Sequence, residues 1–254
     1  MKNLILTVIL NLIVSYSFGQ STFGQPKDSV NFEVNINPDF FLLGTFSDYM
    51  GRFQYIEREN QIDRYYPYEE SLAKYINSFI FHNYNSKCEL KFEKTRHSEL
   101  FNSELAKQLH SEYFDEKGNF IDQKLDSEDK KYSYLLGVYL RYGQHLEDDI
   151  YKIQVANSSK DKELYRILKE LEADKIVYKF LRGYIPSSDI FYFVATPRMI
   201  KYFNIIEKEY QELNRARIEQ TYGKLFESEQ GKQLKEKFET EEKELIKSLK
   251  IVFN

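Results

Sequence analysis

Apolar residues recur at two spacings along this chain, and each spacing predicts one kind of element. Apolar and polar residues alternate over 30–36, which is typical of a half-buried strand. Shorter alternating runs at 88–92 and 151–155 predict two more strands, and the continuous apolar run at 190–195 predicts a fully buried one. We therefore expect three or four short strands.

Between these strands, apolar residues three or four positions apart predict amphipathic helices. Helix starts are expected near Pro38, Pro67 and Pro197, because proline fits the first helical turn, where its missing N–H has no partner. The apolar spacing predicts further helices over about 97–114, over a stretch carrying Leu135, Tyr139, Tyr142 and Leu146, and from about 160 to Tyr184.

These elements predict a helix-rich α+β fold over residues 30–198. Its core is expected to contain the aromatic and aliphatic residues of the apolar stripes. They are Phe46, Leu72, Ile76, Phe79, Leu135, Tyr139, Phe191 and Phe193.

Residues 199–254 differ in composition from the rest of the chain. From 201 onward, eleven basic and eleven acidic residues cancel, and no proline follows Pro197. We expect amphipathic helices that turn near Gly223 or Gly231 and pack on the domain; the alternative is a segment that binds a protein partner. The residues expected to face inward are Phe203, Ile206, Tyr210, Leu213, Leu234, Phe238 and Leu249.

The first nineteen residues have the three parts of a secretory signal peptide. Lys2 precedes an apolar run at 4–14, and Ser17 and Gly19 suit a cleavage site before Gln20. We expect residues 1–19 to be removed, 20–29 to form a flexible lead-in, and the protein to be exported to the periplasm or extracellular space. The alternative is an uncleaved anchor helix. No later segment approaches 18 apolar residues, so no transmembrane segment is expected after cleavage.

Composition narrows the possible partners and the means of stabilisation. Charged residues make up 30% of the 254 positions, the net charge is −4, and the two signs are mixed. This balance predicts no nucleic-acid partner. Cys88 is the only cysteine, so no internal disulfide can form, and it is expected to be a small buried apolar residue.

Four histidines are the natural candidates for chemistry. His97 and His110 begin matching His-Ser-Glu tripeptides, but on one helix they would point about 140° apart and could not grip one metal ion. His145 precedes Glu147 and Asp148, which gives one imidazole and nearby carboxylates. His145, Glu147 and Asp148 are thus candidate catalytic residues, and His97, His110 and His145 are candidate metal ligands. Solvated histidines are the simpler interpretation of each.

No HExxH, GxSxG, GxGxxG or P-loop motif occurs in the sequence. The stretch 30–90 nevertheless carries Asn37-Pro38, Leu42-Leu43-Gly44, Tyr55, Tyr68 and Phe79 to His82. In these features it resembles the N-terminal part of an exported bacterial family of unknown function, some members of which look like zinc metallopeptidases. Because HExxH is absent here, the resemblance implies a shortened, non-catalytic relative and transfers no catalytic residue.

Two classes of function remain open. The absence of catalytic motifs and the charged amphipathic C-terminus favour an exported, non-catalytic binding protein without a cofactor. The alternative is a metal-dependent, peptidase-like hydrolase, which would require zinc. The sequence favours the first class.

Overall fold

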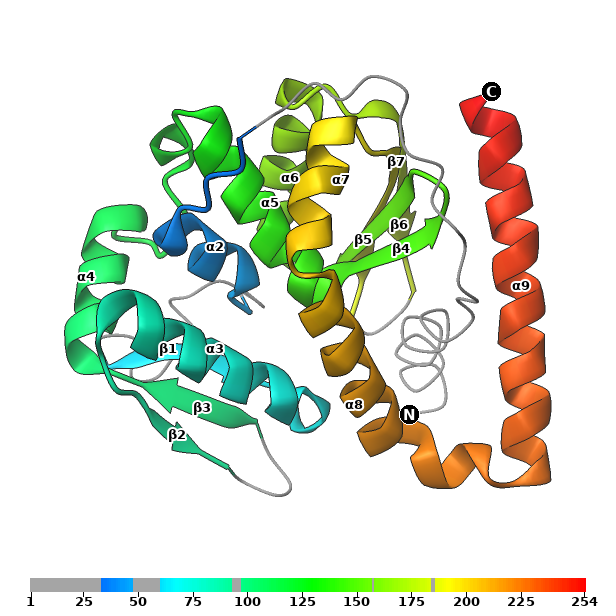
Figure 1. Ribbon diagram of the computed structural model, residues 1–254, viewed down its shortest axis with the longest axis horizontal. Coiled ribbons are helices and arrows are strands. Elements are labelled where there is room, and N and C mark those ends of the chain that lie inside the picture. The colour runs from blue at the N-terminus through cyan, green and yellow to red at the C-terminus, as the bar shows by residue number, and fades with distance from the viewer. Residues whose placement is uncertain (1–32, 48–59, 93–96, 157, 184–185) are drawn as a thin grey trace.

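The computed structural model describes residues 33–47, 60–92, 97–156, 158–183 and 186–254. Helices and strands alternate along the first three quarters of the chain, and the last quarter is helical (Figure 1). The helices are α2 (Pro38–Thr45), α3 (Glu70–Tyr84), α4 (Ser103–Tyr113), α5 (Glu128–Tyr142), α6 (Lys160–Glu170), α7 (Pro197–Ile205), α8 (Glu207–Phe226) and α9 (Glu229–Phe253), with 3₁₀ turns η3 (Pro67–Glu69) and η4 (Asp122–Lys124). The strands are β1 (Gln61–Tyr65), β2 (Glu89–Lys91), β3 (Ser98–Phe101), β4 (Gly143–Glu147), β5 (Ile150–Ala156), β6 (Asp174–Leu181) and β7 (Ser188–Val194).

The strands form two antiparallel sheets, and each sheet follows one of two crossing helices. The smaller sheet has the order β1-β3-β2 and comes after α2, and the larger has the order β4-β5-β7-β6 and comes after α5. The fold is therefore helix-rich α+β, as the apolar spacing predicts. Within the described residues, no helix is both long and apolar enough to cross a lipid bilayer.

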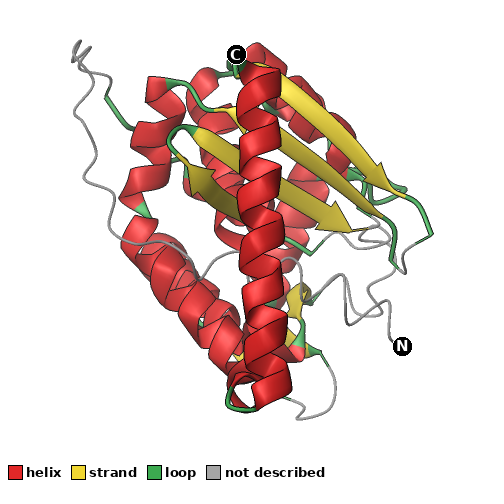
Figure 2. Ribbon diagram, turned by 90° about the vertical axis from the view of Figure 1, so that its right-hand side faces the viewer, coloured by secondary structure: helices red, strands yellow, loops and turns green. Residues whose placement is uncertain are grey.

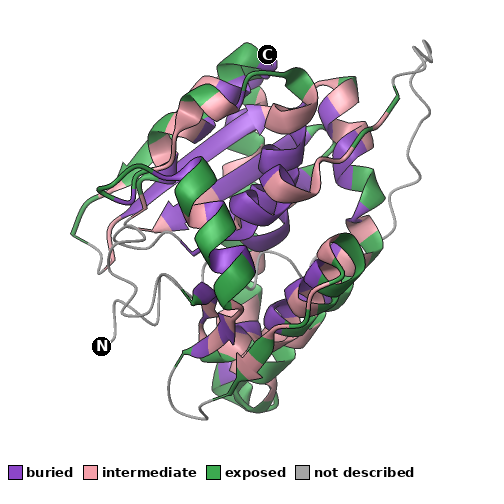
Figure 3. Cartoon of the chain, turned by 90° about the vertical axis from the view of Figure 1, so that its left-hand side faces the viewer, coloured by how far each residue is buried: buried purple, intermediate pink, exposed green. Residues whose placement is uncertain are grey.

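Helices α2 and α5 form the centre of the molecule and approach each other through two glycines. A Cβ atom on Gly44 would lie 2.2 Å from the Tyr134 carbonyl oxygen, and one on Gly137 would lie 2.0 Å from the Phe41 carbonyl oxygen. Real Cβ atoms do not approach backbone this closely, so only glycine permits the crossing. Buried residues gather around it, and exposed residues lie on the outer faces (Figure 3).

The larger sheet lies between the helices of the main apolar cluster and the single helix α9. Its inner face carries Ile153 and Phe191, which belong to the main apolar cluster together with residues of α5, α6 and α7. Its outer face carries Ile190 and Tyr192, which form a separate small cluster with Leu249 of α9. Figure 2 looks onto this outer face, with α9 crossing in front of the sheet.

Local signals place several elements where the sequence predicts them. Asn37 accepts hydrogen bonds from the first backbone N–H groups of α2, and Thr196 caps α7 in the same way. The strands predicted at 88–92, 151–155 and 190–195 correspond to β2, β5 and β7. Of the predicted core residues, seven are buried and Phe79 is partly buried against the same cluster.

Two predictions on the N-terminal side are wrong. Residues 33–37 form no strand, and 30–32 lie outside the described residues. Val34 and Ile36 still pack on the core, so their alternation reflects burial without a strand partner. The helix predicted over 97–114 begins only at Ser103, because Asn102 caps it and the residues before it pair with β1 as strand β3.

Two predicted helices also end earlier than expected. The helix carrying Leu135 ends at Tyr142, since the chain enters β4 at Gly143. The helix from residue 160 ends at Glu170, and the stretch that was expected to continue it is the edge strand β6. The chain therefore holds seven strands within the described residues instead of three or four.

The C-terminal segment is helical, as predicted, and it turns close to the predicted Gly231. Helix α8 ends at Phe226 and α9 begins at Glu229, so the turn falls between Gly223 and Gly231. Of the residues expected to face inward, Leu234 is partly buried and the others are buried. Helix α9 packs on α8 and on the outer face of the larger sheet of its own chain.

Candidate functional site

The C-terminal end of α2 meets side chains from the second half of the chain. Lys160, at the start of α6, is buried and places its Nζ 3.0 Å from the Leu43 carbonyl and 2.7 Å from the Gly44 carbonyl. The Tyr142 hydroxyl donates to the Phe46 carbonyl at 3.0 Å. The last carbonyls of a helix have no partners within it and carry partial negative charge. A buried cation and a hydroxyl satisfy them here.

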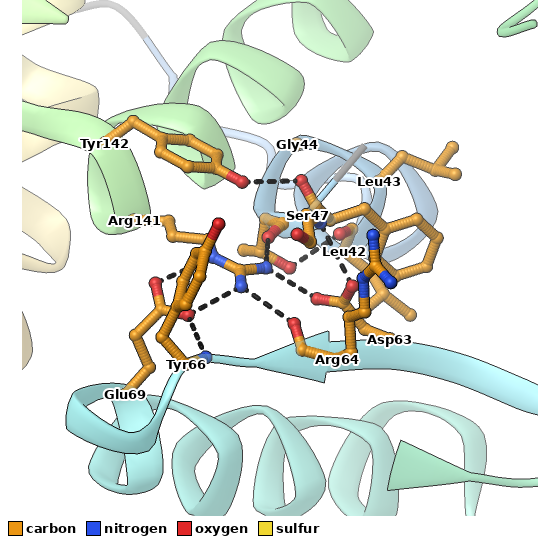
Figure 4. Close-up of polar contacts among 12 residues, drawn as sticks. Leu42, Leu43, Gly44, Ser47, Asp63, Arg64, Tyr66, Glu69, Arg141 and Tyr142 are labelled. Carbon is orange, nitrogen blue, oxygen red and sulfur yellow. Dashed lines mark hydrogen bonds and ion pairs between the residues drawn. The ribbon is translucent and has the colours of Figure 1, made fainter. Parts of the chain in front are cut away.

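Arg141, the penultimate residue of α5, completes this junction (Figure 4). Its Nε donates to Glu69 at 3.0 Å, NH1 donates to the Thr45 carbonyl and to Asp63, both at 2.7 Å, and NH2 donates to the Arg64 carbonyl at 2.9 Å and to Glu69 at 2.7 Å. A guanidinium group has five N–H donors, and all five have partners here. We call Arg141, Asp63 and Glu69 the Arg141 network.

The carboxylates of the Arg141 network are themselves bound on further sides. Asp63 accepts the Ser47 backbone N–H at 3.0 Å, and Glu69 accepts that of Tyr66 at 2.9 Å. Burial would raise the pKa of Glu69, but the charge and hydrogen bonds of Arg141 outweigh it and hold that pKa below its usual range. Glu69 is thus held ionised by a fixed cation. The arrangement joins the two halves of the fold and leaves no donor of Arg141 for a ligand.

The sequence pattern does not predict the Arg141 network, although one signal is present. Arg141 directly follows the buried run Leu135–Leu140 of α5, so a charged side chain lies where the pattern calls for an apolar one. A buried arginine requires carboxylate or carbonyl partners. The identity of those partners depends on the crossing of α2 and α5, which no local pattern reveals.

The candidate residues around His145 lie on strand β4 and the following turn. The helix predicted to carry Leu135 and Leu146 would have His145 near its C-terminal end, which is wrong because α5 ends at Tyr142. His145 Nε2 lies 2.6 Å from the Asp148 carbonyl, which requires the proton on Nε2, and the ring stacks on Tyr151. Lys250 of α9 pairs with Glu147 at 3.1 Å and with Asp148 at 2.8 Å.

The other candidate histidines lie on separate elements. His97 precedes β3 and contacts the ring of Tyr66, and burial holds its pKa below the usual value. His110 lies on α4 and stacks on Phe114. The structure therefore does not bring His97, His110 and His145 together. Among the residues it describes, no group of three His, Cys, Asp or Glu side chains has the geometry of a metal site.

A second buried polar group lies between the larger sheet and α9. Glu242 of α9 accepts a hydrogen bond from Gln144 of β4 at 3.0 Å, and Lys152 of β5 is its charged neighbour. Burial raises the pKa of Glu242 to about 8 and lowers that of Lys152 to about 8, and each charge partly offsets the shift of the other. We call Gln144, Lys152 and Glu242 the α9 seat.

Strand β6 is an edge of the larger sheet, and no described strand pairs with its outer side. It presents two large aromatic side chains to solvent: Tyr178 is 51% exposed and Phe180 is 42% exposed. Both lie on the same face because they are two positions apart in a strand. Lys179 points to the other face, and Arg182 lies over the Phe180 ring.

Comparison with known proteins finds no matching family model and no matching curated protein. Similar solved structures include mesophilic variants of the homing endonuclease I-DmoI, with 13% identity, a TM-score of 0.42 and coverage of 66% of this chain and 93% of that one. I-DmoI in complex with DNA and calcium shows 14% identity, a TM-score of 0.39 and coverage of 66% and 88%. At these TM-scores the similarity assigns neither fold nor function.

One expectation about partners nevertheless needs correction. The mixed charges and the net charge of −4 predict no nucleic-acid partner. The similar structures include a DNA complex, so the exclusion is not kept, but a TM-score of 0.39 assigns no nucleic-acid partner to this chain. The net charge of the whole chain does not give the charge of any single face of the folded protein. It is therefore not sufficient to exclude a nucleic-acid partner. We withdraw the exclusion.

Proposed function

We propose that this chain is an exported, non-catalytic binding protein whose binding surface is the open edge of β6. The observation that carries the proposal is the exposure of Tyr178 and Phe180 on a strand whose outer side no described strand pairs with. An edge strand offers unpaired backbone N–H and C=O groups, and an extended peptide can add to them as a further strand. Exposed aromatic rings supply contact area beside that backbone.

The charges around β6 indicate the chemistry of the bound segment. Lys175, Lys179 and Arg182 lie on or beside the strand, and Asp174 is the acid at its start. Lysines on an edge strand discourage pairing with a second basic edge. They favour an extended segment that carries carboxylates. We therefore infer that the ligand is an acidic polypeptide in extended conformation.

A labelled peptide of alternating Glu and Val residues is the probe for this proposal. We expect it to bind the full chain, and Phe180→Ser should weaken binding about tenfold, or ~1.4 kcal/mol, by removing an aromatic contact. Fluorescence anisotropy measures both affinities. Phe81→Ser is the matched control, because Phe81 is 45% exposed but lies on α3.

A second peptide isolates the contribution of the backbone. The same sequence with N-methyl groups at alternate positions keeps its charges but cannot donate to an edge strand, so we expect it to bind weakly. Equal affinity for the two peptides, or equal loss in both phenylalanine variants, would contradict strand addition. Stoichiometric zinc in the purified protein would favour the metal-dependent hydrolase instead.

Export rests on the N-terminal sequence, which lies outside the described residues. The charged start, the apolar run at 4–14 and the small residues at 17 and 19 support cleavage before Gln20. Mass spectrometry of the protein recovered from a secreting host should give a chain that begins at or near Gln20. Recovery of intact chain from the cytoplasm would refute export.

A further inference from the structure

Helices α8 and α9 are separated by a very short turn. Glu227 follows α8 and has helical torsions, with φ −71° and ψ −24°. Ser228 then has φ −81° and ψ 153°, which is extended, and α9 begins at the next residue. The Ser228 hydroxyl caps α9 by accepting a hydrogen bond from the Gly231 N–H at 3.0 Å. A change of ψ at Ser228 alone would join α8 and α9 into one helix about 70 Å long.

The turn is also sterically tight on one side. A Cβ atom on Gly231 would lie 1.8 Å from the carbonyl oxygen of Leu225 and 2.6 Å from its carbonyl carbon. Both contacts are with backbone, which cannot move aside as a flexible side chain would. In a continuous helix, residues 225 and 231 are about 9 Å apart along the axis, so this contact vanishes. Glycine at 231 is therefore needed for the turned form and not for the straight one.

Helix α9 docks through contacts that are separate from the main core. Leu249 and Phe253 pack with Ile190 and Tyr192 on the sheet, and Phe238 packs with residues of α8. None of these residues belongs to the main apolar cluster, which holds the other helices together. The docking of α9 can therefore be lost without opening that cluster.

The polar contacts of α9 specify the same docking position. The α9 seat places Glu242 against Gln144 and Lys152, and Lys250 pairs with the turn between β4 and β5. The side-chain amide oxygen of Gln144 (Oε1) is buried without a hydrogen-bond partner. The interface therefore also contains a contact that lowers its stability. These contacts involve only α9 and the surface it covers. A second α9 helix could make every one of them.

We propose that α9 leaves its own sheet by straightening at Ser228, and that α9 of a second copy then occupies the same sheet face. The product is a domain-swapped dimer, in which each α9 makes its native contacts on the other protein. The second copy is the occupant that the structure specifies, because it alone reproduces the apolar pairs, the α9 seat and the Lys250 ion pairs together.

The Gly231→Ala variant of the full chain tests the hinge. The added methyl group excludes the turned form, so the variant should be a dimer at concentrations where the wild-type protein is a monomer, as measured by light scattering after size exclusion. Gly223→Ala is the matched control, because a Cβ atom there meets only the Glu219 side chain at 3.7 Å. In the Gly223→Ala variant, helix α8 gains an alanine as α9 does in Gly231→Ala, yet the protein should remain monomeric. A monomeric or aggregated Gly231→Ala variant would overturn the proposal.

A mixing experiment tests whether α9 itself is exchanged. Lys152→Glu leaves two acidic groups in the α9 seat of a monomer, and Glu242→Lys leaves two basic groups there, so neither variant can form an acid–base pair within one chain. In a swapped heterodimer of the two variants, both seats hold opposite charges. Native mass spectrometry should therefore show the heterodimer in large excess over either homodimer. A statistical mixture would show that α9 is not exchanged, even if Gly231→Ala forms dimers by another route.

Discussion

Replacing Arg141 by Met should lower the free energy of unfolding by about 3–5 kcal/mol, because it leaves two buried carboxylates without their cation. Asp63 is fully buried and Glu69 is 5% exposed, so water cannot replace the lost partner. The substitution also removes the donor to the Thr45 carbonyl. Denaturant unfolding, followed by circular dichroism, measures the loss.

An exposed arginine provides the control for this experiment. Arg166 pairs with Glu170 on α6 at 2.9 Å, and its side chain is about one-third exposed. The Arg166→Met variant should cost less than about 1 kcal/mol, since surface ion pairs contribute little. Equal losses in the two variants would show that the Arg141 network contributes no more than a surface pair.

The stability difference should also depend on pH. In the wild-type protein the pKa of Glu69 lies below its usual value, so its contribution to stability is present above about pH 4.5 and is lost as the pH falls below that value. In the Arg141→Met variant, burial still raises the pKa of Glu69, but the charge and hydrogen bonds of Arg141 no longer oppose it, so the acid is easier to protonate. The difference in the free energy of unfolding between the two proteins should therefore become smaller as the pH falls.

The second large effect is expected at the crossing of α2 and α5. The Gly137→Ala variant should lose about 3 kcal/mol, because the new methyl group meets the Phe41 backbone and forces the two central helices apart. The denaturant concentration at the unfolding midpoint should fall, and the dependence of the unfolding free energy on denaturant concentration should stay the same. Gly223→Ala on α8 adds the same methyl group without a backbone contact and should leave stability unchanged or raise it by up to about 1 kcal/mol.

Local signals were sufficient for the elements that local forces determine. The prolines at 38, 67 and 197 mark helical starts, because cap and proline chemistry acts within one turn. The run at 190–195 is a strand because a short apolar stretch buried on both faces suits a central position in a sheet.

The elements that were missed depend on partners far along the chain. Strand β6 contains Ile176 and Val177, five and six positions after Leu171 at the end of a helical stripe, so the sequence alone favours a longer helix. Its strand conformation comes from pairing with β7. The Arg141 network was missed for the same reason, since its members are up to 78 residues apart.

The capping of α2 has a consequence for the synthesis of this protein. The last carbonyl groups of α2, and that of the residue after it, accept hydrogen bonds from Arg141, Tyr142 and Lys160. These donors lie 96 to 117 positions later in the chain than the carbonyls they bind. At about 5–20 residues per second, a ribosome needs roughly 5–20 s to make that stretch. During this interval the nascent N-terminal half holds a helix end without its partners. The junction can close only after α6 has begun to emerge, so the chain folds late in its own translation.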